Sequence, residues 1–270
     1  MKSQYLLRTS CLCLLVLFSA CSGDDNSGSI IDQITGLTPA NDVDLGQQIV
    51  TEIEANPNDY PILSRTQYPE AYTYIEAMTA DILVSDAVNF KDLFPYEVTI
   101  IEDDETLNAF ATPGGFIYVY TGLIKFLDQA DDLAGVMGHE IAHSAERHSK
   151  EQLEKNLGLS FLASALGGGQ ATQLLGGLLG LQFSRSDETE ADAFSVTYLS
   201  DTDYACNGAA TFFEKLSESG GGGTPAFLST HPSPTSRVED INAKAAELGC
   251  STTAISETGM TYEDFQNSLP

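Results

Sequence analysis

The sequence has little positive charge. Of its 270 residues only 12 are lysine or arginine, against 39 aspartate or glutamate, which gives a formal net charge of −27. A chain this acidic repels phosphate backbones and anionic membrane surfaces, so we expect no nucleic-acid partner. The acidic total does not identify a substrate, because most of these carboxylates are expected to form a solvated surface that keeps the protein soluble.

The chain beyond its first 20 residues also lacks an uninterrupted apolar run long enough to cross a membrane. Its most apolar stretch, residues 157–183, contains Ser160, Ser164, Gln170 and adjacent glycines. We expect two short, closely packed helices there, or a mobile flap that partly covers a cleft. No internal repeat is apparent, and 42% hydrophobic residues are typical of a globular chain with a sizeable core.

The first 20 residues are typical of an export signal. Lys2 and Arg8 are followed by a short apolar segment, residues 11–20, of the length expected for a signal-peptide core. The segment ends in small residues before Cys21, a pattern similar to the lipobox of bacterial lipoproteins. We therefore expect cleavage before Cys21 and lipidation of that cysteine. The alternative is an ordinary secretory cleavage near Ala20, which leaves Cys21 as a thiol.

These features divide the chain into four segments: a signal peptide (1–20), a lipid-anchored flexible tether (21–41), one folded domain (42–250) and a C-terminal tail (251–270). We expect an exported protein that contacts the membrane only through its lipid anchor, in the bacterial cell envelope. The outer membrane facing the periplasm is the predicted location, with the cell surface as the alternative. The sequence leaves the oligomeric state open.

The apolar pattern of the folded domain changes along the chain. Residues 41–55 and 69–84 have apolar positions at helical spacing, whereas residues 96–101, 107–112 and 116–120 are short β-prone runs divided by turn formers. Helical periodicity then returns for the rest of the domain, apart from glycine-rich breaks. We therefore predict an α+β fold class, mostly helical, with a small antiparallel sheet.

Cysteine is scarce in the processed chain, where only Cys206 and Cys250 remain besides Cys21. An even pair of cysteines in an oxidising compartment predicts a disulfide between Cys206 and Cys250. The alternative is that both are buried free thiols.

Residues 131–143 are predicted to form a helix that carries the pattern HExxH. Histidines four positions apart lie on one helical face, so His139 and His143 can bind the same zinc ion. Glu140, about a quarter turn away, can hold a metal-bound water and accept its proton. For this motif alone, the alternative is a pair of surface histidines.

A catalytic zinc site needs a third protein ligand and an open position for water. Glu188 supplies that ligand on a second predicted helix, and Asp192 lies one turn further on the same face. Asp192 can accept the ring proton of a ligating histidine, which orients the imidazole. We expect Glu190 to point elsewhere and to be solvated.

Two other kinds of zinc site are disfavoured. The metzincin pattern HExxHxxGxxH fails, because Glu146 stands where glycine should be and Ser149 where the third histidine should be. His148 is one place out of register, so we expect a structural role for it. A purely structural zinc site is usually closed by four ligands, often cysteines, and only three good ones are evident here.

Four motifs in order resemble the zinc metalloendopeptidases of the CAAX-prenyl-endopeptidase type, whose bacterial members include periplasmic and lipoprotein quality-control proteases. They are a strand segment at 108–123, HExxH at 139–143, Glu-x-x-Ala-Asp at 188–192 and a His-Pro motif at 229–237. The resemblance covers about residues 43–248. It implies a zincin-like (gluzincin) domain with one Zn2+ per chain, the ligands His139, His143 and Glu188, and Glu140 as the catalytic residue. The chain lacks the multiple membrane spans of the prenyl-processing members, so prenylated substrates are not implied.

Two residues near the end of the domain complete the predicted site. His231 is our candidate donor to a tetrahedral oxyanion, because the only other histidine outside HExxH is His148. The alternatives for His231 are a structural role, or a fourth zinc ligand that silences the enzyme until it moves. Arg237 is expected to pair with an active-site carboxylate, with a surface ion pair as the alternative.

The strand segment predicts how a substrate binds. An edge strand near residues 111–119 can pair with an extended peptide through main-chain hydrogen bonds, which recognises unfolded chain. The predicted substrate-binding residues are Ala111, Thr112, Pro113, Gly114 and Gly115. The alternative is an interior strand whose aromatic side chains only pack, namely Phe116, Tyr118 and Tyr120.

Together these features predict a zinc-dependent metalloendopeptidase that hydrolyses unfolded or misassembled envelope proteins, with Glu140 as general base. The alternative is a zinc-bound, catalytically latent peptide-binding or chaperone-like module in which His231 closes the metal site. The presence of Glu140 favours the enzyme, because a binder gains nothing from a carboxylate at this position.

Overall fold

The structure is a computed structural model that describes four stretches of the chain, residues 37–180, 182–218, 226–232 and 236–270. The predicted signal peptide, the lipidation site Cys21 and most of the predicted tether lie outside these residues. No helix within the described stretches has the length and apolar character needed to cross a membrane.

Most of the described chain is helical. In chain order the helices are α2 (Pro39–Ala55), α3 (Pro69–Ile82), α4 (Thr121–Phe126), α5 (Ala130–Ala145), α6 (His148–Leu157), α7 (Leu159–Ala165), α8 (Ala171–Leu179), α9 (Arg185–Leu199), α10 (Gly208–Glu218), α11 (Ala226–Thr230), α12 (Arg237–Leu248) and α13 (Tyr262–Asn267). The strands are β1 (Glu97–Ile101), β2 (Ala109–Ala111) and β3 (Phe116–Tyr120). The predicted fold class, α+β and mostly helical, is confirmed.

The sheet is mixed, which corrects the antiparallel sheet expected from the sequence. β3 lies in the centre, β2 pairs antiparallel with one side of it, and β1 pairs parallel with the other. The turn at residues 113–115 closes the β2–β3 hairpin, where the amide of Thr112 donates to the carbonyl of Phe116 at 2.9 Å. The chain between β1 and β2 instead passes to the opposite edge of the sheet. Turn-forming residues mark where strands end, but they do not encode such a crossing.

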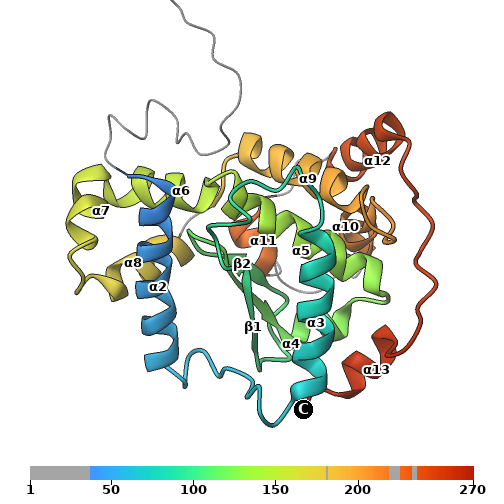
Figure 1. Ribbon diagram of the computed structural model, residues 1–270, viewed down its shortest axis with the longest axis horizontal. Helices are drawn as coiled ribbons and strands as arrows, with labels where there is room; N and C mark the ends of the chain where they lie inside the picture. Colours follow the sequence, from blue (N-terminus) through green and yellow to red (C-terminus); the bar gives the residue numbers. More distant parts are fainter. Residues whose placement is uncertain (1–36, 181, 219–225, 233–235) are drawn as a thin grey trace, which may run out of the picture.

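The central strand β3 separates two hydrophobic cores, because successive side chains of a strand point to opposite faces. Ile117 and Val119 belong to the larger core, with α3, α5, α9, α10 and α12. Phe116, Tyr118 and Tyr120 belong to the smaller core, with α2, α6, α7 and α8. Figure 1 shows the sheet between these two helical groups. The three aromatic residues therefore pack in the interior, as the alternative reading of this segment expects.

Helix α5 runs through the middle of the larger core, and all of its residues are buried. Its crossing with α10 depends on two glycines. A Cβ on Gly135 would overlap the backbone nitrogen of Ala209, and a Cβ on Gly208 would overlap the carbonyl oxygen of Asp131. Helix α9 packs along α5 as well. This packing places the two helices that carry the predicted zinc motifs side by side.

The folded domain extends past both predicted boundaries. Helix α2 begins at Pro39, inside the segment expected to be a tether. In the predicted tail, α13 packs against α3 and buries Tyr262 and Phe265. The amide of Ile255 also donates to the carboxylate of Asp131 in the first turn of α5, at 3.1 Å. Most of the last 20 residues therefore complete the domain.

Cys206 and Cys250 form a disulfide, with Cα atoms 6.2 Å apart and a sequence separation of 44 residues. The bond joins the loop before α10 to the chain just after α12. A second link lies beside it, because the amide of Cys206 donates to the carbonyl of Ser251 at 2.8 Å. These links hold α12, which begins at Arg237, against the rest of the larger core.

Candidate metal centre

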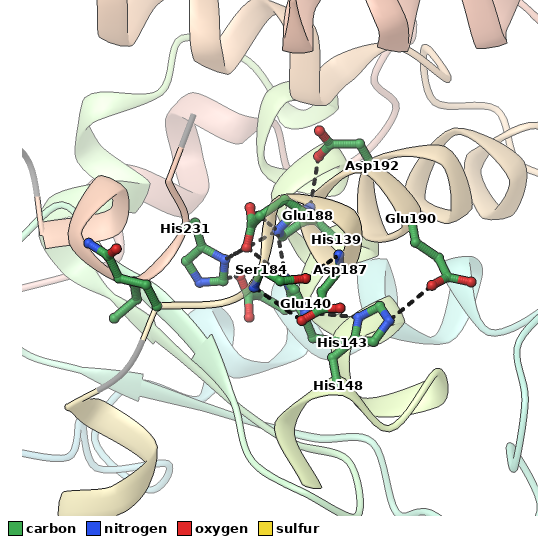
Figure 2. A network of polar contacts seen from close by, with 12 residues as sticks. His139, Glu140, His143, His148, Ser184, Asp187, Glu188, Glu190, Asp192 and His231 are labelled. Atoms are coloured by element: carbon green, nitrogen blue, oxygen red, sulfur yellow. Dashed lines mark hydrogen bonds and ion pairs between the residues drawn. The ribbon is translucent and has the colours of Figure 1, made fainter. Parts of the chain in front are cut away.

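Four buried side chains from three parts of the chain converge on one point (Figure 2). His139 and His143 lie one turn apart on α5, Glu188 lies in the first turn of α9, and His231 follows α11. One potential ligand atom from each side chain lies within 4.8 Å of the other three. The structure therefore brings together the three ligands predicted from the sequence, and it adds His231 to them.

Glu188 occupies this position because α9 begins just before it. The hydroxyl of Ser184 accepts a hydrogen bond from the amide of Asp187, and the carboxylate of Asp187 accepts one from the amide of Ser184. This capping box ends the incoming loop and starts the helix. Glu188 then lies in the first turn, where the positive end of the helix dipole stabilises a carboxylate.

Four distances between these ligand atoms are close to those in a tetrahedral zinc site. Nε2 of His139 lies 3.0 Å from Nε2 of His143 and 3.3 Å from Nδ1 of His231. Oε1 of Glu188 lies 3.1 Å from Nδ1 of His231 and 3.5 Å from Nε2 of His143. Zinc bonds of about 2.0–2.1 Å at tetrahedral angles place neighbouring ligand atoms roughly 3.3 Å apart. Imidazole nitrogens with one carboxylate oxygen are also a common donor set for zinc.

The ionisation of these groups suits metal binding. Burial holds the pKa of His143 well below its ordinary value, and the neighbouring His139 lowers it further. Burial opposes ionisation of Glu188, but the facing His231 and His143 outweigh it and lower the pKa of that carboxyl well below its usual range. A neutral imidazole and an ionised carboxylate are the forms that ligate a metal.

A buried ion-pair network orients two of the ligands from behind. Oδ1 of Asp192 lies 2.9 Å from Nδ1 of His139. Arg237 donates to both carboxylate oxygens of Asp192 at 2.6 Å, and its remaining nitrogen lies 2.9 Å from Oε2 of Glu188. The guanidinium group also stacks on the ring of Phe213 at 3.8 Å. Arg237 is only 2% exposed, so the alternative of a surface ion pair is wrong.

Glu140 lies beside the ligand atoms and does not contact Arg237 or Asp192 directly; its ion-pair partner is His231. It is fully buried, and no side chain among the described residues hydrogen-bonds to its carboxylate, although the backbone of Ala111 is close enough to oppose the rise of its pKa. Burial raises the pKa of Glu140 to about 7, although the nearby His139 opposes the shift. A carboxyl group with this pKa can accept and return a proton near neutral pH.

His231 faces two groups at once. Its Nδ1 lies among the ligand atoms, whereas its Nε2 lies 3.6 Å from Oε1 of Glu140 and has no hydrogen-bond partner in the described part of the chain. The ring stacks on Phe227 with centroids 4.4 Å apart, and its backbone amide donates to the Phe227 carbonyl at 2.8 Å. Helix α11 therefore positions this imidazole between the ligand group and Glu140.

The predicted substrate-binding segment lies mostly inside the domain. Ala111 is in the edge strand β2, but it is buried together with residues 112–115, and a Cβ on Gly114 would overlap the backbone of Val43 in α2. The carbonyl oxygens of residues 111 and 112 accept hydrogen bonds from the hydroxyls of Ser149 and Ser144, at 2.8 and 2.7 Å. These bonds tie the segment to α6 and to the HExxH helix α5.

Among its described residues, the apolar segment before α9 contacts the site through its last residue, Phe183. Helices α7 and α8 occupy most of it, and α8 packs against α2. Phe183 then stacks on the ring of His143 with centroids 3.8 Å apart, and its amide donates to the carbonyl of Thr230 at 3.0 Å. The sequence predicted a flap over the site, and Phe183 is the residue of this segment that covers the ligand group.

His148 and Glu190 contact the site, although the sequence predicts a structural role for His148 and a solvated position for Glu190. Nδ1 of His148, the first residue of α6, lies 3.1 Å from Nδ1 of His143. Nε2 of His148 lies 3.3 Å from Oε2 of Glu190, so Glu190 does not simply point into solvent as expected. The turn between α5 and α6 creates these contacts. Arg147 adopts a left-handed conformation there, with φ of 63°, and its side chain pairs with Asp42 of α2 at 2.6 Å.

The sequence matches one protein family and is similar to several known proteins. Residues 69–245 match the family described as Peptidase family M48. "Mitochondrial metalloendopeptidase OMA1" of Schizosaccharomyces pombe is 38% identical over 154 residues, which are 54% of this chain and 45% of that protein. "Beta-barrel assembly-enhancing protease" of Escherichia coli is 32% identical over 184 residues, 62% of this chain and 37% of that protein. "Metalloprotease YcaL" of Escherichia coli is 30% identical over 161 residues, 56% of this chain and 62% of that protein. The chain thus covers less than two thirds of each of these relatives.

Proposed function

The chain belongs to peptidase family M48, and from this premise we propose that it is a zinc-dependent metalloendopeptidase. The observation that carries the proposal is the position of Glu140 beside four converging ligand atoms. Glu140 is a buried carboxyl group with a raised pKa and no side-chain hydrogen-bond partner among the described residues. Three relatives whose names describe proteases support the same activity. The narrower resemblance to the CAAX-prenyl-endopeptidase type stays a prediction from the sequence.

The proposed mechanism assigns His139, His143 and Glu188 as the ligands of one zinc ion. When bound, zinc lowers the pKa of water and polarises a carbonyl group. Glu140 accepts the proton of the attacking water and then donates it to the leaving amine. Asp192 keeps His139 in the tautomer and orientation that ligation through Nε2 requires.

His231 has two candidate roles, and the geometry supports each of them through a different nitrogen. Nε2 faces Glu140, from where we propose that it donates to the oxyanion that forms during hydrolysis. Nδ1 lies 3.1 Å from Oε1 of Glu188 and 3.3 Å from Nε2 of His139, which favours a fourth-ligand position. The second candidate function is therefore a latent, peptide-binding state that His231 holds closed.

The proposed substrate is an extended, unfolded segment of polypeptide. The strand β2 lies at the edge of the sheet and contacts the HExxH helix α5, so we propose that such a segment adds to β2 as a further strand near Ala111. Residues 112–115 are proposed to hold that strand in place. Because main-chain pairing selects for unfolded chain, we propose unfolded or misassembled envelope proteins as the partners. The name of the Escherichia coli relative, which refers to β-barrel assembly, supports a role in the envelope.

We also propose that the chain is exported and held by a lipid on Cys21 at the outer membrane, facing the periplasm. The support is the sequence of residues 1–21, which lies outside the described residues. Expressed with its own signal in a bacterial host, the wild type is expected in the membrane fraction and Cys21→Ala in the soluble fraction. Equal partition of both forms would show that Cys21 is not the anchor.

Cleavage of reduced casein tests the proposed activity. The soluble chain starting at Ser22, loaded with zinc, is expected to cut casein, to stop when a chelator removes the metal, and to resume when zinc is added back. These three conditions separate metal-dependent cleavage from a contaminating protease of another class. Zinc-loaded protein that binds casein but leaves it intact would replace the enzyme by the latent peptide-binding module.

A further inference from the structure

His143 has a partner on the side of its ring that faces away from the other ligands. Its Nε2 faces the ligand atoms of His139 and Glu188, at 3.0 and 3.5 Å. Its Nδ1 instead lies 3.1 Å from Nδ1 of His148, and Nε2 of His148 lies 3.3 Å from Oε2 of Glu190. Figure 2 shows these three side chains in a row, with His148 between His143 and Glu190.

The proton positions along this row follow from ligation. A neutral imidazole that binds a metal through Nε2 carries its proton on Nδ1, so His143 must donate from Nδ1. His148 must then accept with its own Nδ1, which leaves its proton on Nε2. That proton points at the carboxylate of Glu190, which is an acceptor. A His148 ring with its proton on Nδ1 would face His143 donor to donor.

Burial limits the hydrogen-bond partners that are available to His148. The side chain of His148 is only 5% exposed, so its ring has little access to water as a substitute partner. Glu190 is 52% exposed and ends the row at the surface. It also lies on α9, two residues after Glu188, so the helix that supplies the third ligand supplies the last member of the row.

We propose that His148 and Glu190 are positioning residues that fix the tautomer and ring orientation of the zinc ligand His143. Asp192 orients His139 in the same way, by accepting the proton on its Nδ1. The two histidine ligands are therefore oriented by separate partners. The inference rests on the zinc site proposed above, but it concerns metal binding and not the cleavage step.

The zinc affinity of the soluble chain, measured by competition with a chromophoric chelator, tests the inference. His148→Leu removes the acceptor and is expected to weaken zinc binding about 10–100-fold, as losses of such partners do. His148→Asn places an amide oxygen where Nδ1 stands, and is expected to keep the affinity within about threefold of wild type. Glu190→Gln is expected to fall between these variants, whereas the matched surface change Glu214→Gln on α10 leaves the affinity unchanged.

Nitrogen NMR of the histidine rings gives a second readout, independent of affinity. In the zinc-loaded wild type, His143 is expected to carry its proton on Nδ1 and His148 on Nε2. A proton on Nδ1 of His148 overturns the inference, and so does a His148→Leu variant that binds zinc as tightly as wild type. If His148→Asn binds as weakly as a folded His148→Leu, the inference fails too. A wild-type chain that binds no zinc overturns the proposed function itself, so the two failures are distinguishable.

Discussion

Replacing Glu140 by glutamine is expected to lower the rate of casein cleavage by about 10²–10⁴-fold, the range typical for the loss of a positioned general base. Glutamine has nearly the same shape as glutamate but cannot accept the proton of the attacking water. Glu140 is not among the four ligand groups, so the variant is expected to bind zinc as the wild type does. A large loss of rate at equal metal content would therefore locate the defect in proton transfer.

The matched control for this variant is Glu146→Gln. Burial also raises the pKa of Glu146 to about 7, with a further contribution from Glu190, but this carboxyl group bonds to Asn89 and lies outside the ligand group. Glu146→Gln is expected to keep most of the activity. Cleavage by zinc-loaded Glu140→Gln at the wild-type rate would rule out Glu140 as the base, whatever the control shows.

Glu140→Gln is also expected to change how the stability of the zinc-free chain depends on pH. Burial raises the pKa of Glu140 from 4.5 in the unfolded reference to about 7, so the folded state favours the protonated form. The folded wild type then loses stability as the pH rises through about 7, whereas glutamine does not titrate. We expect thermal denaturation to show Glu140→Gln more stable than wild type at pH 8, with a smaller difference below pH 5.

Replacing Arg237 by leucine is expected to lower the free energy of unfolding of the zinc-free chain by about 3–5 kcal/mol, the cost typical of removing one partner of a buried ion pair. Arg237 bridges the carboxylates of Glu188 and Asp192, which are both buried. Without the guanidinium group these two buried carboxylates lose the cation that pairs with both of them. Arg237→Lys is expected to recover only part of the loss, because an ammonium group cannot make the two-pronged contact with Asp192.

Chemical denaturation of the three forms measures this effect, and Lys155→Leu provides the matched control. Lys155 lies 3.7 Å from Glu151 and 3.6 Å from Asp187, but its side chain is 54% exposed. Its loss is expected to cost less than about 1 kcal/mol, as is usual for exposed ion pairs. Equal losses for Arg237→Leu and Lys155→Leu would contradict the buried bridge described here.

Much of the site follows from the sequence, because it depends on local helical geometry. The spacing of His139 and His143 places both imidazoles on one face of any helix that includes them, and the same spacing relates Glu188 to Asp192. Cys206 and Cys250 are the two cysteines left in the predicted folded domain, so their pairing needed no knowledge of the fold. Helical and strand periodicity likewise predicted α2, α3 and the three strands to within a few residues.

Contacts between distant segments depended on the tertiary structure. The strand order puts β3 in the centre, and no local pattern separates this arrangement from an antiparallel meander. Arg237 reaches Asp192, 45 residues away in the chain, only because α12 packs against α9. Whether such an arginine is buried or exposed depends on that packing, which is why the sequence left both roles open.

The contacts of His148 and Glu190 with the site also depend on the tertiary structure. A histidine five positions after His143 would point away from it on a continuous helix, and the left-handed turn at Arg147 brings it back. That turn is held by Asp42, more than 100 residues earlier in the chain. The sequence by itself therefore predicted the candidate zinc ligands, since one helical turn suffices to align His139 with His143 and Glu188 lies on a second predicted helix. The tertiary structure decided between the two roles of Arg237 and added His148 and Glu190, because these contacts form between helices that meet only when the chain has folded.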